Sequence, residues 1–219
     1  TCEVCRGGHG TEDPHFVGFD GSQYYFEGAG GQDYNIITDN DFQLNAHFVR
    51  LNQLKGTYMG RLGVRFGENS FTFDPHFGVF YNNTLMTSGE VDLPEGSFSV
   101  QTNERMTLFF QNDVYQFSAN VAIEKGVKAE SYINVHAALI GVPSHPHGIL
   151  GQTARIAIPG ADPLPKPFAV EGKESDYHVT DGLLGTEFTF NKFVGAPQPI
   201  TVSATRARRA AATPLFEAK

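Results

Sequence analysis

A turn signal between two aromatic runs constrains the fold of this chain most strongly. Asp20-Gly21 separates residues 16–19 from residues 24–26, and both runs are rich in phenylalanine or tyrosine. Glycine accepts a positive φ without a steric clash and aspartate can bond its own backbone, so this pair favours a tight turn. Aromatic runs on both sides of such a turn predict a β-hairpin over residues 16–26.

The next stretch alternates between apolar and polar residues. Phe42, Leu44, Ala46 and Phe48 fall on one face, and Asp41, Gln43, Asn45 and His47 fall on the other. This period of two predicts a strand with one buried and one wet face. The same reasoning predicts further strands over 57–66, a meander over 97–124, a long strand over 131–142 and a last strand over 187–194.

Composition supports a turn-rich β protein. The chain has 219 residues, with 24 Gly, 12 Pro and only 18% charged residues. That length is enough for one sizeable hydrophobic core that does not need disulfide bonds or metal ions to be stable. We therefore predict an all-β fold in one domain over residues 1–195, followed by a basic tail over residues 196–219.

Several motifs resemble a known family. The pattern Asp-Pro-His-Phe-x-Gly-Phe-Asp-Gly-x-x-Tyr-x-Phe-x-Gly over residues 13–28 resembles the opening of a von Willebrand factor type D domain. Asn-Ala-His-Phe at 45–48 resembles the plant root-cap, or late-embryogenesis-like, family. His-Gly-Ile-Leu-Gly-Gln-Thr at 147–153 and the stretch 168–177 with Leu183-Leu184 agree with it. The resemblance spans roughly residues 12–194. It implies that the all-β fold is a large antiparallel β-sandwich like that of type D domains, in a secreted protein.

The cysteines are few for such a family. Type D domains usually carry many disulfides, whereas this chain has only Cys2 and Cys5. A Cys-x-x-Cys pair can form a small disulfide loop, half of a zinc site with His9 or His15, or a redox pair. Secretion favours the disulfide. The chain starts at Thr1 without Met, and we expect either a removed leader or a trimmed end.

Charge and hydropathy exclude two classes of partner. The formal net charge is −8, so we expect no nucleic-acid footprint over the body of the protein. No apolar run approaches the roughly 18 residues of a membrane span. Asn82-Asn83-Thr84 is an N-glycosylation sequon in a turn-like context, which fits a surface loop of a secreted glycoprotein.

The tail differs in charge from the rest. Arg206, Arg208, Arg209 and Lys219 against Glu217 give residues 196–219 a charge of +3, which leaves 12 basic and 23 acidic residues, or −11, on residues 1–195. One interpretation is a solvated end. The other is an assembly tail that docks on an acidic surface of its own or a neighbouring chain.

Histidines supply the candidate metal ligands. Asn45-x-His47 and Asn134-x-His136 have the same spacing on two predicted strands, and neighbouring strands would let the two pairs converge on a metal or polar ligand. His145-Pro-His147 is the densest group, and its proline could present both rings outward. The alternative is an ordinary polar sheet face.

Calcium binding receives little support. The type D resemblance implies an acidic, asparagine-rich calcium loop near residues 148–155, and this chain lacks those oxygen ligands there. Asp13, Asp20, Asp39 and Asp41 are other oxygen donors, but turn and capping roles explain them equally well.

No catalytic motif is present. The chain has no Gly-x-Ser-x-Gly, no His-Glu-x-x-His, no phosphate loop and no dinucleotide fingerprint. Its tyrosines offer a sugar-stacking surface or, more simply, aromatic core: Tyr24, Tyr25, Tyr58 and Tyr81.

We predict a non-enzymatic, secreted structural or extracellular-matrix protein. Its expected partners are copies of itself or cell-wall and matrix polysaccharide. The alternative is an extracellular module that binds a polysaccharide or a metal, with calcium or zinc as the candidate ions. A carbohydrate-active enzyme is the third hypothesis; it would need two convergent carboxylates in a cleft.

Overall fold

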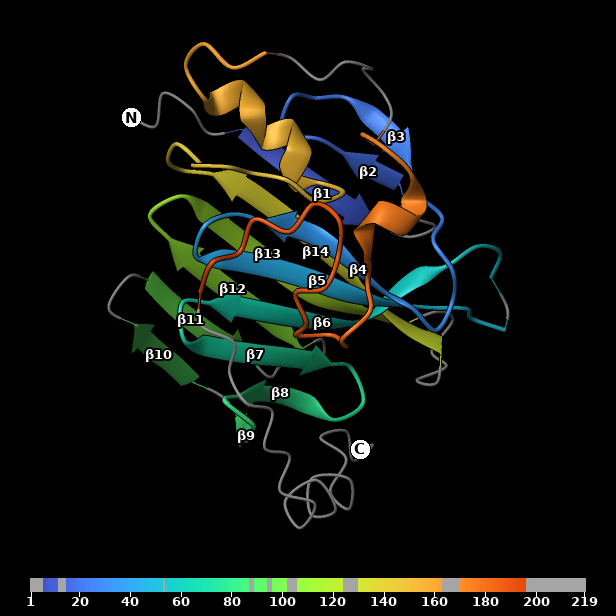
Figure 1. Ribbon diagram of the computed structural model, residues 1–219. Helices are drawn as coiled ribbons and strands as arrows, with labels where there is room; N and C mark the ends of the chain where they lie inside the picture. The colour runs from blue at the N-terminus through green and yellow to red at the C-terminus, as the bar shows by residue number, and fades with distance from the viewer. Residues whose placement is uncertain are drawn as a thin grey trace.

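The computed structural model describes residues 6–11, 15–52, 54–86, 89–93, 96–101, 106–123, 130–162 and 170–195. Within these ranges the chain forms two antiparallel β-sheets that pack face to face, together with two short 3₁₀ helices (Figure 1). The predicted all-β sandwich is confirmed. No helix in the described part of the chain is long and apolar enough to cross a membrane.

The first sheet has eight strands. Their order across the sheet is β10 (Gly89–Leu93), β11 (Gly96–Gln101), β12 (Thr107–Asn112), β13 (Tyr115–Ile123), β14 (Ser131–Leu139), β1 (Arg6–Thr11), β2 (His15–Val17) and β3 (Gln23–Tyr25). Strands β11 to β13 form the predicted meander, and β14 is the predicted long strand, which ends at Leu139. β1 from the start of the chain pairs with β14, so the N-terminal hairpin extends a sheet built mainly from later residues.

The second sheet has seven strands. Their order is β15 (His178–Val179), β4 (Asp33–Thr38), β5 (Phe42–Val49), β6 (Tyr58–Phe66), β7 (Asn69–Asp74), β8 (Gly78–Tyr81) and β9 (Thr84–Met86). The predicted strands over 42–48 and 57–66 both lie here.

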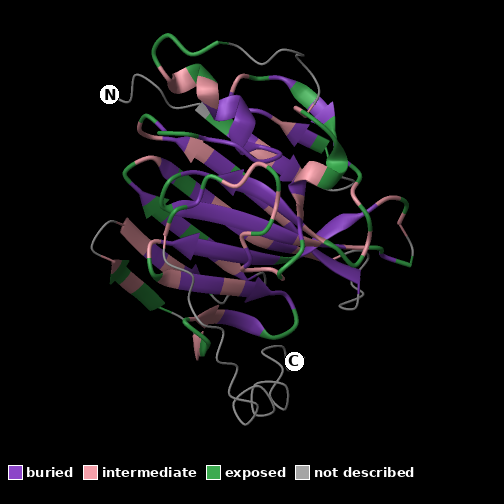
Figure 2. Cartoon of the chain, viewed as in Figure 1, coloured by how far each residue is buried: buried purple, intermediate pink, exposed green. Residues whose placement is uncertain are grey.

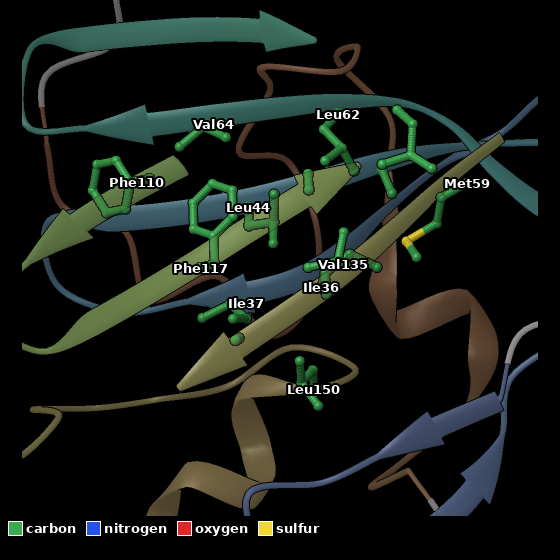
Figure 3. Packing of buried hydrophobic residues seen from close by; sticks show 14 of the residues in the cluster. Ile36, Ile37, Leu44, Met59, Leu62, Val64, Phe110, Phe117, Val135 and Leu150 are labelled. Carbon is green, nitrogen blue, oxygen red and sulfur yellow. The ribbon is translucent and has the colours of Figure 1, made fainter. Parts of the chain in front are cut away.

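The core fills the space between the sheets with phenylalanine. Phe42 of β5 stacks on Phe110 of β12 with ring centroids 5.1 Å apart, and Phe71 of β7 approaches Phe98 of β11 to 4.0 Å. Figure 3 shows Phe110 and Phe117 of one sheet next to Leu44 and Val64, which belong to the facing sheet. Each fully buried side chain of this size contributes about 1.5–3 kcal/mol to folding.

Two turns follow directly from their sequences. Asp20-Gly21 joins β2 and β3 as predicted: Gly21 has φ of +82°, and the Asp20 carboxylate accepts from the backbone N–H of Ser22 at 2.9 Å. Asp74-Pro-His-Phe forms the β7–β8 turn, where the Asp74 carboxylate accepts from the N–H of His76 at 2.8 Å. Both aspartates therefore serve as turn caps.

The chain after β14 docks on the outer edge of β4. The backbone N–H groups of Ile149 and Leu150 donate to the carbonyl oxygens of Asn35 and Ile36, at 3.1 and 2.8 Å. The 3₁₀ helix η3 (Gly151–Ala157) follows, and the second 3₁₀ helix, η4 (Glu174–Tyr177), precedes β15. The Gly-Ile-Leu-Gly-Gln-Thr motif therefore occupies a sheet edge that would otherwise be unpaired.

The predicted strand over 187–194 is wrong. Residues 183–194, which we name the covering segment, instead cross the outer face of the seven-stranded sheet in an irregular path (orange to red in Figure 1). Phe193 is buried beneath the Arg65 guanidinium, which lies 4.5 Å from the centre of its ring. The segment is fixed by side chains of the sheet rather than by a strand ladder.

Candidate functional site

The covered outer face of the seven-stranded sheet hides a cluster of amides. The Asn45 amide donates to the carbonyl oxygen of Leu183 at 2.9 Å, and the Gln43 amide donates to that of Gly185. Asn35 donates to the Asn45 side-chain oxygen at 2.9 Å. The prediction that Gln43 and Asn45 face solvent is wrong, because the covering segment supplies carbonyl acceptors that let these amides be buried.

The two Asn-x-His pairs do not converge. His47 lies on the seven-stranded sheet, where its Nδ1 contacts the Asp33 carboxylate at 2.6 Å. His136 lies on β14 in the eight-stranded sheet. Because these positions belong to different sheets of the sandwich, the predicted shared metal site is wrong.

The His145-Pro-His147 turn presents only one ring outward. His145 is exposed, whereas His147 is 2% exposed and stacks on Phe190 with centroids 4.1 Å apart. The prediction of two outward rings is therefore wrong for His147, because its ring packs into the contact between the 143–150 loop and the covering segment.

Both ring nitrogens of His147 are engaged. Its Nδ1 accepts from the backbone N–H of Gly148 at 2.8 Å, which places the proton on Nε2, where it faces the Glu171 carboxylate at 3.2 Å. Burial, together with nearby Arg155, lowers the pKa of His147 from its usual 6.5 to about 4. A neutral imidazole with both nitrogens used is a structural bridge and has no free position for a metal.

The buried Asp39 carboxylate binds the same 143–150 loop. Its carboxylate accepts from the Tyr115 hydroxyl at 2.9 Å and from the backbone N–H groups of Ser144 and His145 at 3.2 and 2.7 Å. Burial, and then Asp39, raise the pKa of the Tyr115 hydroxyl well above its usual 10. Asp39 therefore holds the 143–150 loop against the core, and these bonds leave it no role as a calcium ligand.

The opposite outer face, that of the eight-stranded sheet, is open. We define the open face by side chains that point away from the core at register positions across the strands and are half-buried or exposed: Ser97, Ser99, Thr107, Phe109, Gln111, Gln116, Ser118, Asn120, Asn134, His136, His9, His15, Val17, Gln23 and Tyr25. Figure 2 shows that β5 and β6 are mostly buried, whereas β10 to β12 of the eight-stranded sheet mix buried, half-buried and exposed residues.

One row of the open face runs across seven strands. Register pairs join Ser99, Phe109, Ser118, His136, His9, Val17 and Gln23 in that order. At a strand spacing of about 4.8 Å this row is about 29 Å long. A row of this length can contact several units of an extended polymer.

The open face is nearly uncharged. Strands β2, β3 and β11 to β14 contain no Asp, Glu, Lys or Arg, although the protein carries a net charge of −8. The edge strand β10 holds Glu90 and Asp92. The face therefore offers hydroxyls, amides and imidazoles over its centre, with charge restricted to its border.

Two aromatic rings are exposed on this face. Phe109 is 40% exposed and Tyr25 is 49% exposed. Of the four tyrosines considered as stacking residues, only Tyr25 is well exposed: Tyr24 and Tyr58 are buried, and Tyr81 packs on Phe71 at 5.0 Å. Phe109 was missed by sequence reasoning, since a phenylalanine within an apolar run is usually core.

Of the remaining predicted sites, the structure describes only the glycosylation site. Asn82 lies in the β8–β9 turn with an exposed side chain, and its side-chain oxygen accepts from the backbone N–H of Ser70 at 2.8 Å. The predicted disulfide of Cys2 and Cys5, and Asp13, lie outside the described residues. The predicted assembly tail with Arg206, Arg208 and Arg209 lies outside them as well.

In the described part of the chain, no group of three or more His, Cys, Asp or Glu side chains could hold a metal ion. No protein-family model matches the chain, and no curated protein matches it.

Proposed function

We propose that this protein is a secreted, non-catalytic matrix protein that binds neutral polysaccharide on the open face of its eight-stranded sheet. The observation that carries the proposal is the composition of that face. A row about 29 Å long holds hydroxyl, amide and imidazole groups together with Val17 and the exposed Phe109. The strands β2, β3 and β11 to β14 carry no charged residue.

This chemistry matches a neutral sugar chain. Such polymers present many hydroxyl groups and apolar C–H faces and carry no charge. Serine, asparagine and glutamine side chains both donate and accept hydrogen bonds. Exposed rings such as Phe109 and Tyr25 provide apolar surfaces for the C–H faces. An acidic or basic polymer would instead be expected to select a charged surface.

Three further points support a secreted binding role. The resemblance of residues 12–194 to root-cap-like, type D-like chains is an argument for secretion and for this kind of sandwich. The Asn82 sequon is exposed on a turn. The most deeply buried histidine and carboxylate of the described residues, His147 and Asp39, are used in structural hydrogen bonds, so neither is poised for catalysis.

Affinity electrophoresis tests the proposal. Native gels would contain a neutral β-glucan, a neutral mannan or an acidic galacturonan at equal mass concentration. We expect a neutral polymer to retard the protein and added salt to leave that retardation unchanged, because charge pairs do not hold the complex. Equal mobility in all gels, or retardation by galacturonan alone that salt abolishes, would rule out the proposal.

Self-assembly is the second candidate, and the charge asymmetry of the chain favours it. Residues 196–219 carry +3 against −11 on the rest, and the edge strand β10 exposes Glu90 and Asp92. Sedimentation velocity of the full chain and of a chain ending at residue 195, at low and high salt, tests it. We expect large, salt-sensitive species that need the tail; two monomeric forms at every salt concentration would exclude self-assembly.

A further inference from the structure

A pair of histidines stands side by side on the open face. His9 of β1 and His136 of β14 are register partners, with ring centroids 5.7 Å apart and ring planes tilted by 38°. His136 is exposed and His9 is half-buried. Because paired strands fix both backbones, the sheet rather than a loop sets the separation of the two rings.

We propose that His9 and His136 together bind a transition-metal ion such as Zn²⁺, with water or a ligand from another molecule in the remaining positions. A Zn–N bond of about 2.0–2.1 Å puts the metal about 3.2 Å from each ring centre, and tetrahedral ligands then have ring centres about 5.2 Å apart. The observed 5.7 Å differs from this by about half an ångström, which small side-chain rotations cover.

Three of the residues that adjoin His9 and His136 on this face are small. The neighbouring register pair on one side is Gly7 opposite Ala138, and the next residue across the sheet from His136 is Ser118. Glycine, alanine and serine are all small residues, so these three positions leave room for a hydrated ion. Since no third His, Cys, Asp or Glu of the described chain completes the site, two coordination positions or more stay open.

The ligand chemistry selects the class of metal. Imidazole suits Zn²⁺, Cu²⁺ and Ni²⁺, whereas Ca²⁺ and Mg²⁺ prefer oxygen ligands. A histidine binds metal in its neutral form.

This site is separate from the predicted one. His136 was expected to pair with His47, which lies on the other sheet. The site shares His9 and His136 with the row proposed to bind polysaccharide, but metal binding needs only these two imidazoles and no sugar. Its open positions would let a metal link this face to a further donor molecule.

Isothermal titration of ZnCl₂ into the full chain at about pH 7.5 tests the proposal. The background carries Cys2→Ser and Cys5→Ser so that thiolates do not compete. The test variants are His9→Ala and His136→Ala, and the matched control is His76→Ala, an exposed histidine on the β7–β8 turn. Circular dichroism verifies that each variant is folded.

We expect one Zn²⁺ per chain, and each test substitution should weaken binding by at least the ~10-fold that loss of an outer-shell partner costs. His76→Ala should bind as the parent does, and CaCl₂ should give no binding. Absence of Zn²⁺ binding in the parent would overturn the proposal. So would unchanged affinity in either His9→Ala or His136→Ala, or Ca²⁺ binding that depends on both histidines.

Discussion

The side-chain amide of Asn45 donates to the carbonyl oxygen of Leu183 at 2.9 Å, across 138 residues of sequence. This bond lies under the covering segment and closes the outer face of the seven-stranded sheet. The eight-stranded sheet has no such cover over its described strands, so its polar side chains reach the surface. The asymmetry between the two faces is the basis for assigning binding to one of them.

Alanine substitutions at two glycines, one on each outer face, test whether only the seven-stranded sheet is covered. A Cβ added at Gly63 of β6 would collide with the carbonyl oxygen of Leu183, whereas one added at Gly7 of β1 meets only the Ala137 carbonyl oxygen at 3.7 Å. Gly63→Ala should therefore cost about 1–3 kcal/mol of unfolding free energy. Gly7→Ala should change it by less than about 0.5 kcal/mol. Urea unfolding measures both; equal effects would mean that the covering segment is not fixed on the sheet.

The bond between Tyr115 and Asp39 should contribute measurably to stability. Tyr115→Phe removes a hydroxyl that donates to a buried carboxylate at 2.9 Å, and we expect a loss of about 1.5–3 kcal/mol. Tyr81→Phe is the matched control, because its hydroxyl donates to the neutral Asn69 at the partly buried edge of the sheet. It should cost about 0.5–1.5 kcal/mol. A smaller loss for Tyr115→Phe than for Tyr81→Phe in urea unfolding would contradict this account of Asp39.

Stability should fall in mild acid because of His147. The unfolded chain takes up the proton near pH 6.5, while the folded chain takes it up only near pH 4. The unfolded state therefore binds more protons between these values, and stability present above pH 6.5 is lost as the pH falls towards 4. The loss from this group is about 2–3 kcal/mol.

The variant His147→Phe isolates that contribution. Phenylalanine keeps a ring between Tyr177 and Phe190 but does not titrate. The unfolding free energy of the variant should depend less steeply on pH between 6.5 and 4 than that of the parent protein, although other carboxylates still titrate. Identical slopes would show that His147 does not resist protonation in the folded state.

Asn82 should carry a glycan when the protein is secreted by a glycosylating host. Its side chain is exposed in the β8–β9 turn, where Asn82 and Asn83 have φ of +42° and +65°. Intact-mass measurement should show one glycan that Thr84→Ala removes and Thr84→Ser retains, because serine preserves the sequon. A glycan that persists in Thr84→Ala would place the modification elsewhere.

The strands could be predicted because the alternation of apolar and polar residues follows the alternation of buried and exposed positions along a strand. Phe42, Leu44, Ala46 and Phe48 all face the core as predicted, and Asp20-Gly21 forms the predicted hairpin turn. Both features depend only on neighbouring residues. The all-β class followed from the number of such strands and the scarcity of helical periodicity, whereas the sandwich was what the type D resemblance implied.

The features that were missed depend on distant parts of the chain. Gln43 and Asn45 look like a wet face in sequence, and only the covering segment, about 140 residues later, provides the carbonyl acceptors that bury them. His9 lies in a glycine-rich run without strand propensity. Its place beside His136 depends on the pairing of β1 with β14, which local patterns do not encode.

The most direct test of the open face compares two exposed phenylalanines. Phe109 lies on that face and is 40% exposed, whereas Phe77 lies in the β7–β8 turn of the other sheet and is 44% exposed. The measurement is the dissociation constant for neutral β-glucan by affinity electrophoresis of Phe109→Ala and Phe77→Ala. Phe109→Ala should weaken binding by about 1 kcal/mol, roughly fivefold, and Phe77→Ala should leave it unchanged. Unchanged binding in Phe109→Ala, or equal loss in both variants, would contradict the assignment of binding to this face.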